Sequence, residues 1–324
     1  SQEAGSPSQV LVTGIRGSIE SSIAIKKEPD SVVDAITAED IGKLPDTSIA
    51  ESIARLPGIT AQRVAGRAQV ISLRGLAPDF AVTLLNGREQ TSTSNDRSAE
   101  FDQYPSELLS GVVVYKTPDS AMTSAGLSGT IDLRAVRPLD RRGRAIAVNV
   151  RGEHNGNGAL NDGWSTNGKR MSVSYIDQYL GNTLGFAIGY AHLDTPGQQK
   201  EYKSWWWGTN NKLPAGDEDV VALKGAEVTA TSRKQVRDGL MAVIDYKPNR
   251  AVRSVVDLYY SQFDQKEIMR GMMWNSADSV TYRDPRIESM GDVRLLTGGT
   301  LVNLQPIVRN DYNDKEDKEF TVFI

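Results

Sequence analysis

The chain contains no cysteine and only two histidines among its 324 residues. Without cysteine it can form no disulfide framework, no thiolate metal site and no cysteine nucleophile. Neither His154 nor His192 lies in a metal-binding spacing such as His-Glu-x-x-His, and residues 126–129 are neither a nucleophile elbow nor a phosphate loop. These absences predict that the protein is not an enzyme, and we expect no cofactor and no bound metal.

The sequence also has little excess of charge and no long apolar run. Its 37 Lys and Arg residues are outnumbered by 41 Asp and Glu, which gives a net charge of -4. Such a balance does not build the basic surface that binds phosphate backbones, so we expect no nucleic-acid partner. No segment approaches the roughly 18 apolar residues of a membrane helix. A membrane β-barrel stays compatible with this, because its lipid-facing apolar residues alternate with small or polar ones.

Residues 30–140 combine helix and strand signals. A capping box at Ser48–Glu51 predicts a helix start, and Pro57-Gly58 predicts its end, because Pro cannot continue a helix and Gly tolerates a left-handed exit. Asn86-Gly87 supplies the positive φ angles of a tight hairpin turn. Strands are predicted at Val70–Leu73, Ala81–Leu85, Val112–Tyr115 and Ile131–Leu133. We therefore expect a small α+β domain at 30–140, preceded by a flexible segment at 1–29.

From residue 141 to 324 the pattern changes to long antiparallel strands. In Leu184–Ala191 every large residue lies on one face and every small residue on the other. Residues 180–183 and 246–250 are predicted tight turns, whereas long polar loops are predicted at 156–168, 195–235 and 264–300. Short turns at one end and long loops at the other are typical of an outer-membrane barrel. A soluble antiparallel sandwich has the same periodicity, but the strand length and loop asymmetry favour the barrel.

A series of short motifs runs in order through the first region. They are Leu44-Pro45-Asp46, Leu56-Pro57-Gly58-Ile59, Ile71-Ser72-Leu73-Arg74-Gly75, Leu84-Leu85-Asn86-Gly87-Arg88, Phe101–Leu108, Val113–Pro118 and Gly129–Leu133. As an ordered set they resemble the plug domain of TonB-dependent outer-membrane receptors. Ser128 and Ala135 depart from that pattern, where Gly and Thr are frequent. The sequence Gln103-Tyr104-Pro105 resembles that of the subgroup common in Xanthomonas- and Caulobacter-type bacteria.

The resemblance implies a plug that fills a 22-stranded barrel in the Gram-negative outer membrane. It implies import of a bulky solute with energy relayed by the periplasmic C-terminal domain of TonB and its inner-membrane complex. We expect an oligosaccharide as solute, with an iron-siderophore or cobalamin as the alternative. A soluble β-rich binding or adhesion module is the alternative of another class. Only five or six barrel strands are expected here, so we expect the chain to hold an N-terminal part of the barrel. We also expect that the signal peptide is absent or removed from this chain.

The resemblance also assigns roles to particular residues. Gln9–Thr13 (Gln9, Val10, Leu11, Val12, Thr13) resembles the TonB box, an extended segment that adds a strand to the sheet edge of TonB. A terminal strand docked on the plug is the alternative interpretation. Arg74 and Arg88 are expected to hold the plug to carboxylates of the barrel wall. Asp96 and Arg97 are candidates for ligand contact, with simple solvation as the alternative.

Three consecutive tryptophans, Trp205, Trp206 and Trp207, are the most unusual stretch of the second region. Their faces could stack on saccharide rings, or they could anchor the chain at the membrane interface, where Trp is enriched. If this loop is extended, Trp205 and Trp207 share a face and Trp206 opposes them. Near the end of the chain, the acidic residues of 311–317 suggest a calcium loop, but Glu316 stands where the loop needs Gly. We therefore expect a solvated acidic loop there.

Overall fold

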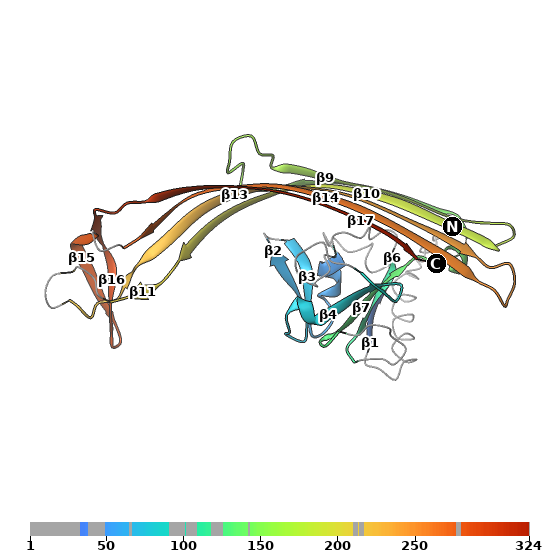
Figure 1. The fold of residues 1–324 in the computed structure, drawn as a ribbon, viewed down its shortest axis with the longest axis horizontal. Helices are drawn as coiled ribbons and strands as arrows, with labels where there is room; N and C mark the ends of the chain where they lie inside the picture. The colour runs from blue at the N-terminus through green and yellow to red at the C-terminus, as the bar shows by residue number, and fades with distance from the viewer. Residues whose placement is uncertain are drawn as a thin grey trace, which may run out of the picture.

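The computed structural model describes residues 33–37, 49–64, 67–90, 101, 109–117, 126–141, 143–209, 213, 217–276 and 280–323. The predicted TonB-binding segment Gln9–Thr13 and the predicted ligand contacts Asp96 and Arg97 lie outside these ranges. The described chain forms a small domain with a five-stranded sheet, and a long six-stranded sheet that arches over this domain (Figure 1). Among the described helices, none has the length and hydropathy needed to cross a membrane.

The small domain is built around a mixed sheet. Its strand order is β1 (Val33–Thr37), β6 (Leu109–Tyr115), β7 (Gly129–Ala135), β4 (Ala81–Leu85) and β5 (Arg88–Glu89). Strands β4 and β7 are parallel, and the other pairs are antiparallel. A hairpin of β2 (Ile59–Val64) and β3 (Arg67–Leu73) packs beside the helix α3 (Ile49–Ile53), and the short helix η1 (Pro78–Phe80) precedes β4. The four predicted strands are confirmed, with longer ends.

Local sequence explains the turns of this domain. Asn86 and Gly87 have φ angles of 53° and 79°, the pair of positive values that a two-residue hairpin between β4 and β5 requires. After α3, Gly58 has a φ of 74°, which an L side chain rarely adopts. The side chains of Ile49 and Ile53 are buried and belong to one apolar core with those of β3, β6 and β7. The predicted hairpin turn is confirmed, whereas the helix ends at Ile53, before the predicted end at Pro57-Gly58.

The long sheet is antiparallel throughout. Its order is β17 (Ile307–Phe323), β14 (Ser254–Asn275), β13 (Gly225–Tyr246), β10 (Leu184–Ser204), β9 (Asn167–Tyr179) and β8 (Ala145–His154). Two further hairpins lie at the end farthest from the small domain: β11 (Trp207–Gly208) with β12 (Ala222–Leu223), and β15 (Thr281–Met290) with β16 (Val293–Val302). The short helix η4 (Pro138–Asp140) leads from the small domain into β8. The predicted fold class, an α+β domain followed by about six antiparallel strands, is confirmed.

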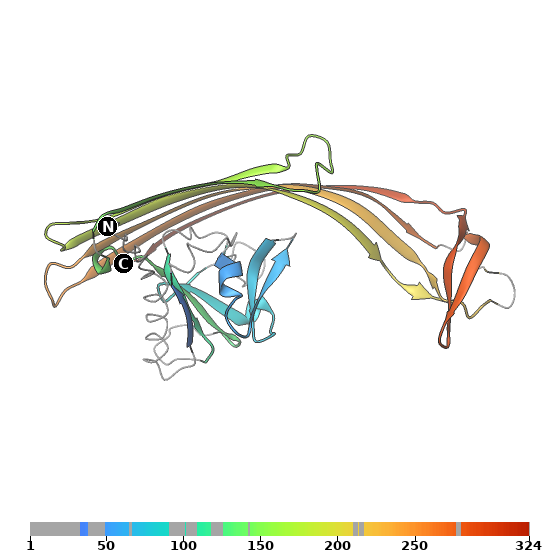
Figure 2. The same cartoon turned by 180° about the vertical axis from the view of Figure 1, so that it is seen from behind.

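The two faces of the long sheet carry different residues. On β10, Gly185, Ala187 and Gly189 are buried on the concave face, which lies over the small domain (Figure 2). Ile188 and Tyr190 point to the convex face and are exposed. The predicted separation of large and small residues is therefore confirmed, and the large residues are the ones that face outward.

The predicted loops at 195–235 and 264–300 are wrong. Strand β10 continues to Ser204 and β13 begins at Gly225, with the strands β11 and β12 between them. Strand β14 continues to Asn275, and β15 and β16 fill most of the next interval. The acidic loop predicted at 311–317 is also wrong, because these residues lie within β17 and pair with β14. In the second half of β10 and in residues 311–317 of β17 most residues on both faces are polar, so apolar periodicity does not reveal these strands. The tight turn at 180–183 is confirmed, with positive φ angles at Leu180, Gly181 and Asn182.

Candidate functional site

One carboxylate of the long sheet holds the small domain at two points. Asp257, a buried residue on the concave face of β14, accepts hydrogen bonds from both terminal guanidinium nitrogens of Arg137, at 2.6 and 3.1 Å. Its Oδ2 also accepts a hydrogen bond from Asn86 Nδ2 at 3.0 Å. A bidentate Arg–carboxylate pair is both strong and specific in geometry. We call Asp257 with Arg137 and Asn86 the first anchor.

Asn86 connects this anchor to the interior of the small domain. Its backbone N–H donates to Leu133 O at 2.8 Å, and its Oδ1 accepts from the Ala135 N–H at 2.8 Å. The next residue, Gly87, donates its N–H to the buried carboxylate of Asp132 at 2.9 Å. Burial raises the pKa of Asp132, and the nearby Arg134 opposes that rise. The β4–β5 turn thereby contacts both β7 and the long sheet, which we also call the wall.

A second carboxylate, Asp245 of β13, forms another anchor at the exit of the small domain. It is fully buried and accepts two hydrogen bonds from Arg253, at 2.9 and 2.6 Å, and one from the Leu139 N–H at 3.4 Å. Arg253 also pairs with Asp140 at 3.1 Å. The helix η4 can lie this close because β10 has Gly185 beneath it, where a Cβ would stand 2.7 Å from Pro138 Cβ.

The contacts predicted for Arg74 and Arg88 remain predictions. Both side chains are exposed, and Arg74 has a φ of 55° in the turn after β3. In the described part of the chain, ion pairs to the long sheet come from Arg137, just before η4, and from Asp140 within it. The sequence contains a signal for the partner of Arg137: Asp257 is the one charged residue in the first part of β14, 254–260, where its neighbours are mainly aliphatic and aromatic.

The three tryptophans do not share one arrangement. The rings of Trp205 and Trp206 are stacked, with centroids 5.8 Å apart and planes at 18°. The prediction that Trp206 opposes Trp205 is therefore wrong. Beyond the end of β10 at Ser204 the pairing continues, because the Trp205 N–H donates to Gly225 O and the Lys224 N–H donates to Trp206 O, both at 2.9 Å. Trp207 begins β11 and is half exposed.

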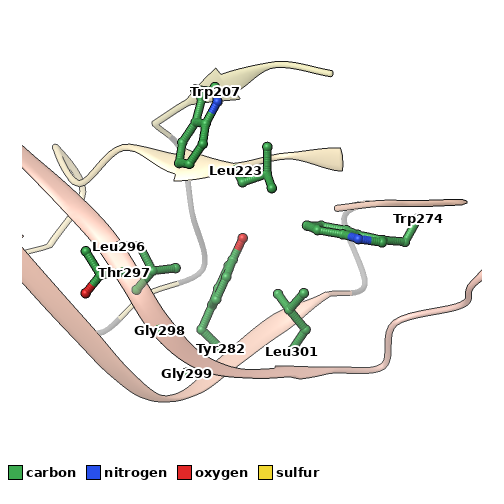
Figure 3. Close-up of a pocket in the computed structure, with 9 residues that line it drawn as sticks. All are labelled: Trp207, Leu223, Trp274, Tyr282, Leu296, Thr297, Gly298, Gly299 and Leu301. Carbon is green, nitrogen blue, oxygen red and sulfur yellow. The ribbon is translucent and has the colours of Figure 1, made fainter. Parts of the chain in front are cut away.

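Trp207 lines a pocket of about 270 Å³ between the two distal hairpins (Figure 3). The other lining residues are Leu223, Trp274, Tyr282, Leu296, Thr297, Gly298, Gly299 and Leu301. Trp207 and Leu223 approach from the β11–β12 hairpin, Trp274 from the end of β14, and Tyr282 and Leu301 from the β15–β16 hairpin. Sequence reasoning found Trp207 alone, because the other residues lie up to about a hundred positions away along the chain.

The Tyr282 hydroxyl is the polar group at the centre of this pocket. It points into the space between Trp207, Leu223 and Trp274 (Figure 3). The oxygen is buried and has no hydrogen-bond partner in the described part of the chain. Burial raises the pKa of this phenol, so it stays protonated at neutral pH and can donate a hydrogen bond.

Comparison with known families bears on the small domain. Residues 25–131 match the model of the TonB-dependent receptor plug domain. This part of the chain is similar to a TonB-dependent receptor plug domain. The plug therefore comprises the five-stranded sheet, and it lies beneath the concave face of the long sheet. TonB-dependent receptors of this fold are proteins of the Gram-negative outer membrane, so the predicted localisation is confirmed at that level.

The chain also matches solved structures of several receptors. A mutant of the ferric enterobactin receptor PfeA from Pseudomonas aeruginosa has 12% identity, with 91% of this chain and 47% of that chain covered and a TM-score of 0.43. The siderophore receptor PirA from Acinetobacter baumannii has 12% identity, coverage of 78% and 48%, and a TM-score of 0.41. The outer membrane transporter YddB from Escherichia coli has 11% identity, coverage of 90% and 53%, and a TM-score of 0.39. The chain thus spans about half the length of these proteins.

Proposed function

We propose that this chain is part of a TonB-dependent importer that carries a solute across the outer membrane. The observation that carries the proposal is the plug domain anchored beneath the concave face of a sheet whose other face exposes large apolar residues. An apolar outward band suits lipid, and a plug on the inner side suits a gated lumen. The chain divides, in this proposal, into a tether at 1–29, the plug at 30–140 and the first barrel strands at 141–324.

In this mechanism TonB binds Gln9–Thr13 as an added strand. Strand addition suits an extended segment with free backbone groups, and the remainder of 1–29 serves as the tether. A pull on the tether would act on the plug against its two anchors at Asp257 and Asp245. Both anchors are side-chain contacts, so the plug can shift or leave without breaking the wall's own hydrogen-bond ladder.

We propose an oligosaccharide as the solute. The distal pocket offers aromatic faces and one hydroxyl donor, and none of its lining residues carries a charge. On the concave face of the wall, three described cations pair with carboxylates: Arg233 pairs with Glu267, Arg309 with Glu227 at 3.6 Å, and Lys315 with Asp317 at 3.0 Å. Such a surface suits a neutral hydroxylated solute better than a strongly anionic iron chelate, although several similar structures are named as siderophore receptors.

The energy link is tested by Val10→Pro in the full-length protein. Proline removes a backbone donor from the strand that would pair with TonB. We expect uptake to be abolished and solute binding to be unchanged, with Val10→Thr as a control that keeps the donor and the β-branched shape. Loss of binding together with uptake would mean that the segment is a structural strand of the plug.

The solute is tested by direct binding to purified full-length protein. The probes are neutral malto-, xylo-, cello- and manno-hexaose on one side and ferric enterobactin and cobalamin on the other. We expect at least one hexasaccharide to bind and the iron chelate not to bind. Binding of the chelate or cobalamin alone would replace the solute but keep the transporter. Recovery of the protein in the periplasm or medium, rather than in the outer-membrane fraction, would favour a soluble binding module.

A further inference from the structure

The two hairpins that form the distal pocket are fastened to each other. Arg294 of β16 pairs with Asp219 at 2.7 Å and with Asp217, both just before β12. Beside these ion pairs, the backbone is also bonded: the Val221 N–H donates to Arg294 O at 2.8 Å, and the Leu296 N–H donates to Val221 O at 2.9 Å. The two hairpins are far apart in sequence, so these contacts are tertiary. They fix the positions of the two hairpins relative to each other and thereby fix the shape of the pocket.

The two hydroxyl groups of the pocket differ in whether they already have a hydrogen-bond partner. The Thr297 hydroxyl contacts Arg286 O at 3.3 Å and Glu288 Oε1 at 3.2 Å, so it is already engaged. The Tyr282 hydroxyl is buried without a partner and points into the pocket. Burying a hydroxyl without a hydrogen bond is unfavourable, and a ligand that accepts from it would remove that cost.

The size and surface of the pocket limit what it can hold. Its volume of about 270 Å³ is below the roughly 300 Å³ at which pockets for drug-sized ligands begin, so one ring fits and a whole oligosaccharide does not. Gly298 and Gly299 expose backbone at its edge, and Trp207 and Trp274 present indole rings from two sides. A flat ring with apolar C–H faces and hydroxyls at its rim matches these groups.

We propose that this pocket is a recognition site for a single neutral sugar ring of the solute, with Trp207 and Trp274 against its faces and Tyr282 donating a hydrogen bond to one of its oxygens. The proposal rests on the proposed function, since it names a contact of the imported solute. The site lies far from the plug, at the loop end of the sheet. The solute would therefore meet it before it enters the lumen.

The test measures affinity for the neutral hexasaccharide that the full-length protein binds, by calorimetry and by quenching of tryptophan fluorescence. Tyr282→Phe removes the donor and keeps the ring, and we expect affinity to fall about tenfold, as for one lost hydrogen bond. Trp274→Ala removes an indole face and should lower affinity further. Matched controls are Tyr202→Phe, an exposed tyrosine on β10, and Trp164→Ala, both outside the lining residues, and these should bind as wild type.

The outcomes separate the pocket from the transporter. If Tyr282→Phe and Trp274→Ala bind the hexasaccharide as wild type, the pocket is not a recognition site, and the import proposal stands as long as uptake still requires Val10. If uptake does not require Val10, the import proposal fails whatever the pocket does. If ferric enterobactin binds with the same dependence on Tyr282 and Trp274 and no hexasaccharide binds, the proposed ligand class is overturned. Thermal melting of each variant checks that the fold is kept.

Discussion

The plug sheet and the long sheet use the same alternating residue pattern with opposite results. In the plug, Val112 and Val114 are buried in the core, as expected for a sheet in water. In β8 of the long sheet, Ile146 is 65% exposed and Val148 is 71% exposed, although they are just as apolar. Large apolar side chains that line up on an outer face in this way need a medium other than water, and a lipid bilayer provides it.

The difference also explains the inner face of the long sheet. Gly185 and Ala187 are buried there, where a soluble sheet would place its largest side chains. Small residues let the wall approach the plug closely, and the buried carboxylates Asp245 and Asp257 then attach it. The core of the long sheet is therefore the plug itself, which makes the two regions one structural unit.

The largest effect is expected from a charge on the outer face. Val148→Lys would place an ammonium group in the lipid band, and we expect the free energy of unfolding in liposomes to fall by about 2–4 kcal/mol. Asn149→Lys, the next residue along the strand and on the other face, is the control and should cost much less. Equal and small costs for both variants would mean that both faces of β8 meet water.

A smaller effect is expected at the first anchor. Asp257→Ala leaves Arg137 and Asn86 without their common acceptor, and because Arg137 is partly exposed we expect a loss of about 2 kcal/mol from plug stability. Hydrogen exchange of the β7 amides would measure it in the full-length protein. Asp264→Ala, on the same strand but on the outer face, is the control. Unchanged exchange in Asp257→Ala would show that this anchor does not hold the plug.

The smallest effect is expected where β10 of the wall contacts the helix η4, which follows the plug. Gly185→Val would bring side-chain atoms into Pro138 and Leu139, and we expect about 1–2 kcal/mol of overpacking cost. Gly152→Val is the control, because nothing lies within 4 Å of a Cβ at that position. Urea midpoints of the two variants give the comparison, and a larger cost at Gly152 would mean that the close approach at Gly185 is unimportant.

Sequence reasoning predicted the structure correctly where a local motif is compatible with only one conformation. Asn86-Gly87 predicted a hairpin turn, and Leu184–Ala191 predicted a strand with unlike faces, and both are present. It failed beyond the apolar band, where β10 and β17 continue with polar residues on both faces and show no apolar period. Pairing with neighbouring strands, which the sequence of one strand does not show, extends them there.

The candidate sites divide in a similar way. Trp207 was found because three adjacent tryptophans are unusual, whereas Tyr282 and Trp274 have ordinary sequence surroundings and become neighbours only through the folding of the hairpins. Arg74 and Arg88 were selected by family resemblance, and their contacts stay a prediction. Asp257 could have been noticed as the one charged residue in the apolar stretch 255–260, since a buried charge requires a partner.

The most direct test of the central claim is a spin-label scan along β8. This chain has no cysteine, so single cysteines at positions 146 to 150 can each carry a nitroxide without a background label from the chain itself. In liposomes, we predict that oxygen, which concentrates in lipid, relaxes the labels at 146, 148 and 150, and that a water-soluble nickel complex relaxes those at 147 and 149. Equal access of the nickel complex to all five positions would contradict a lipid-facing wall.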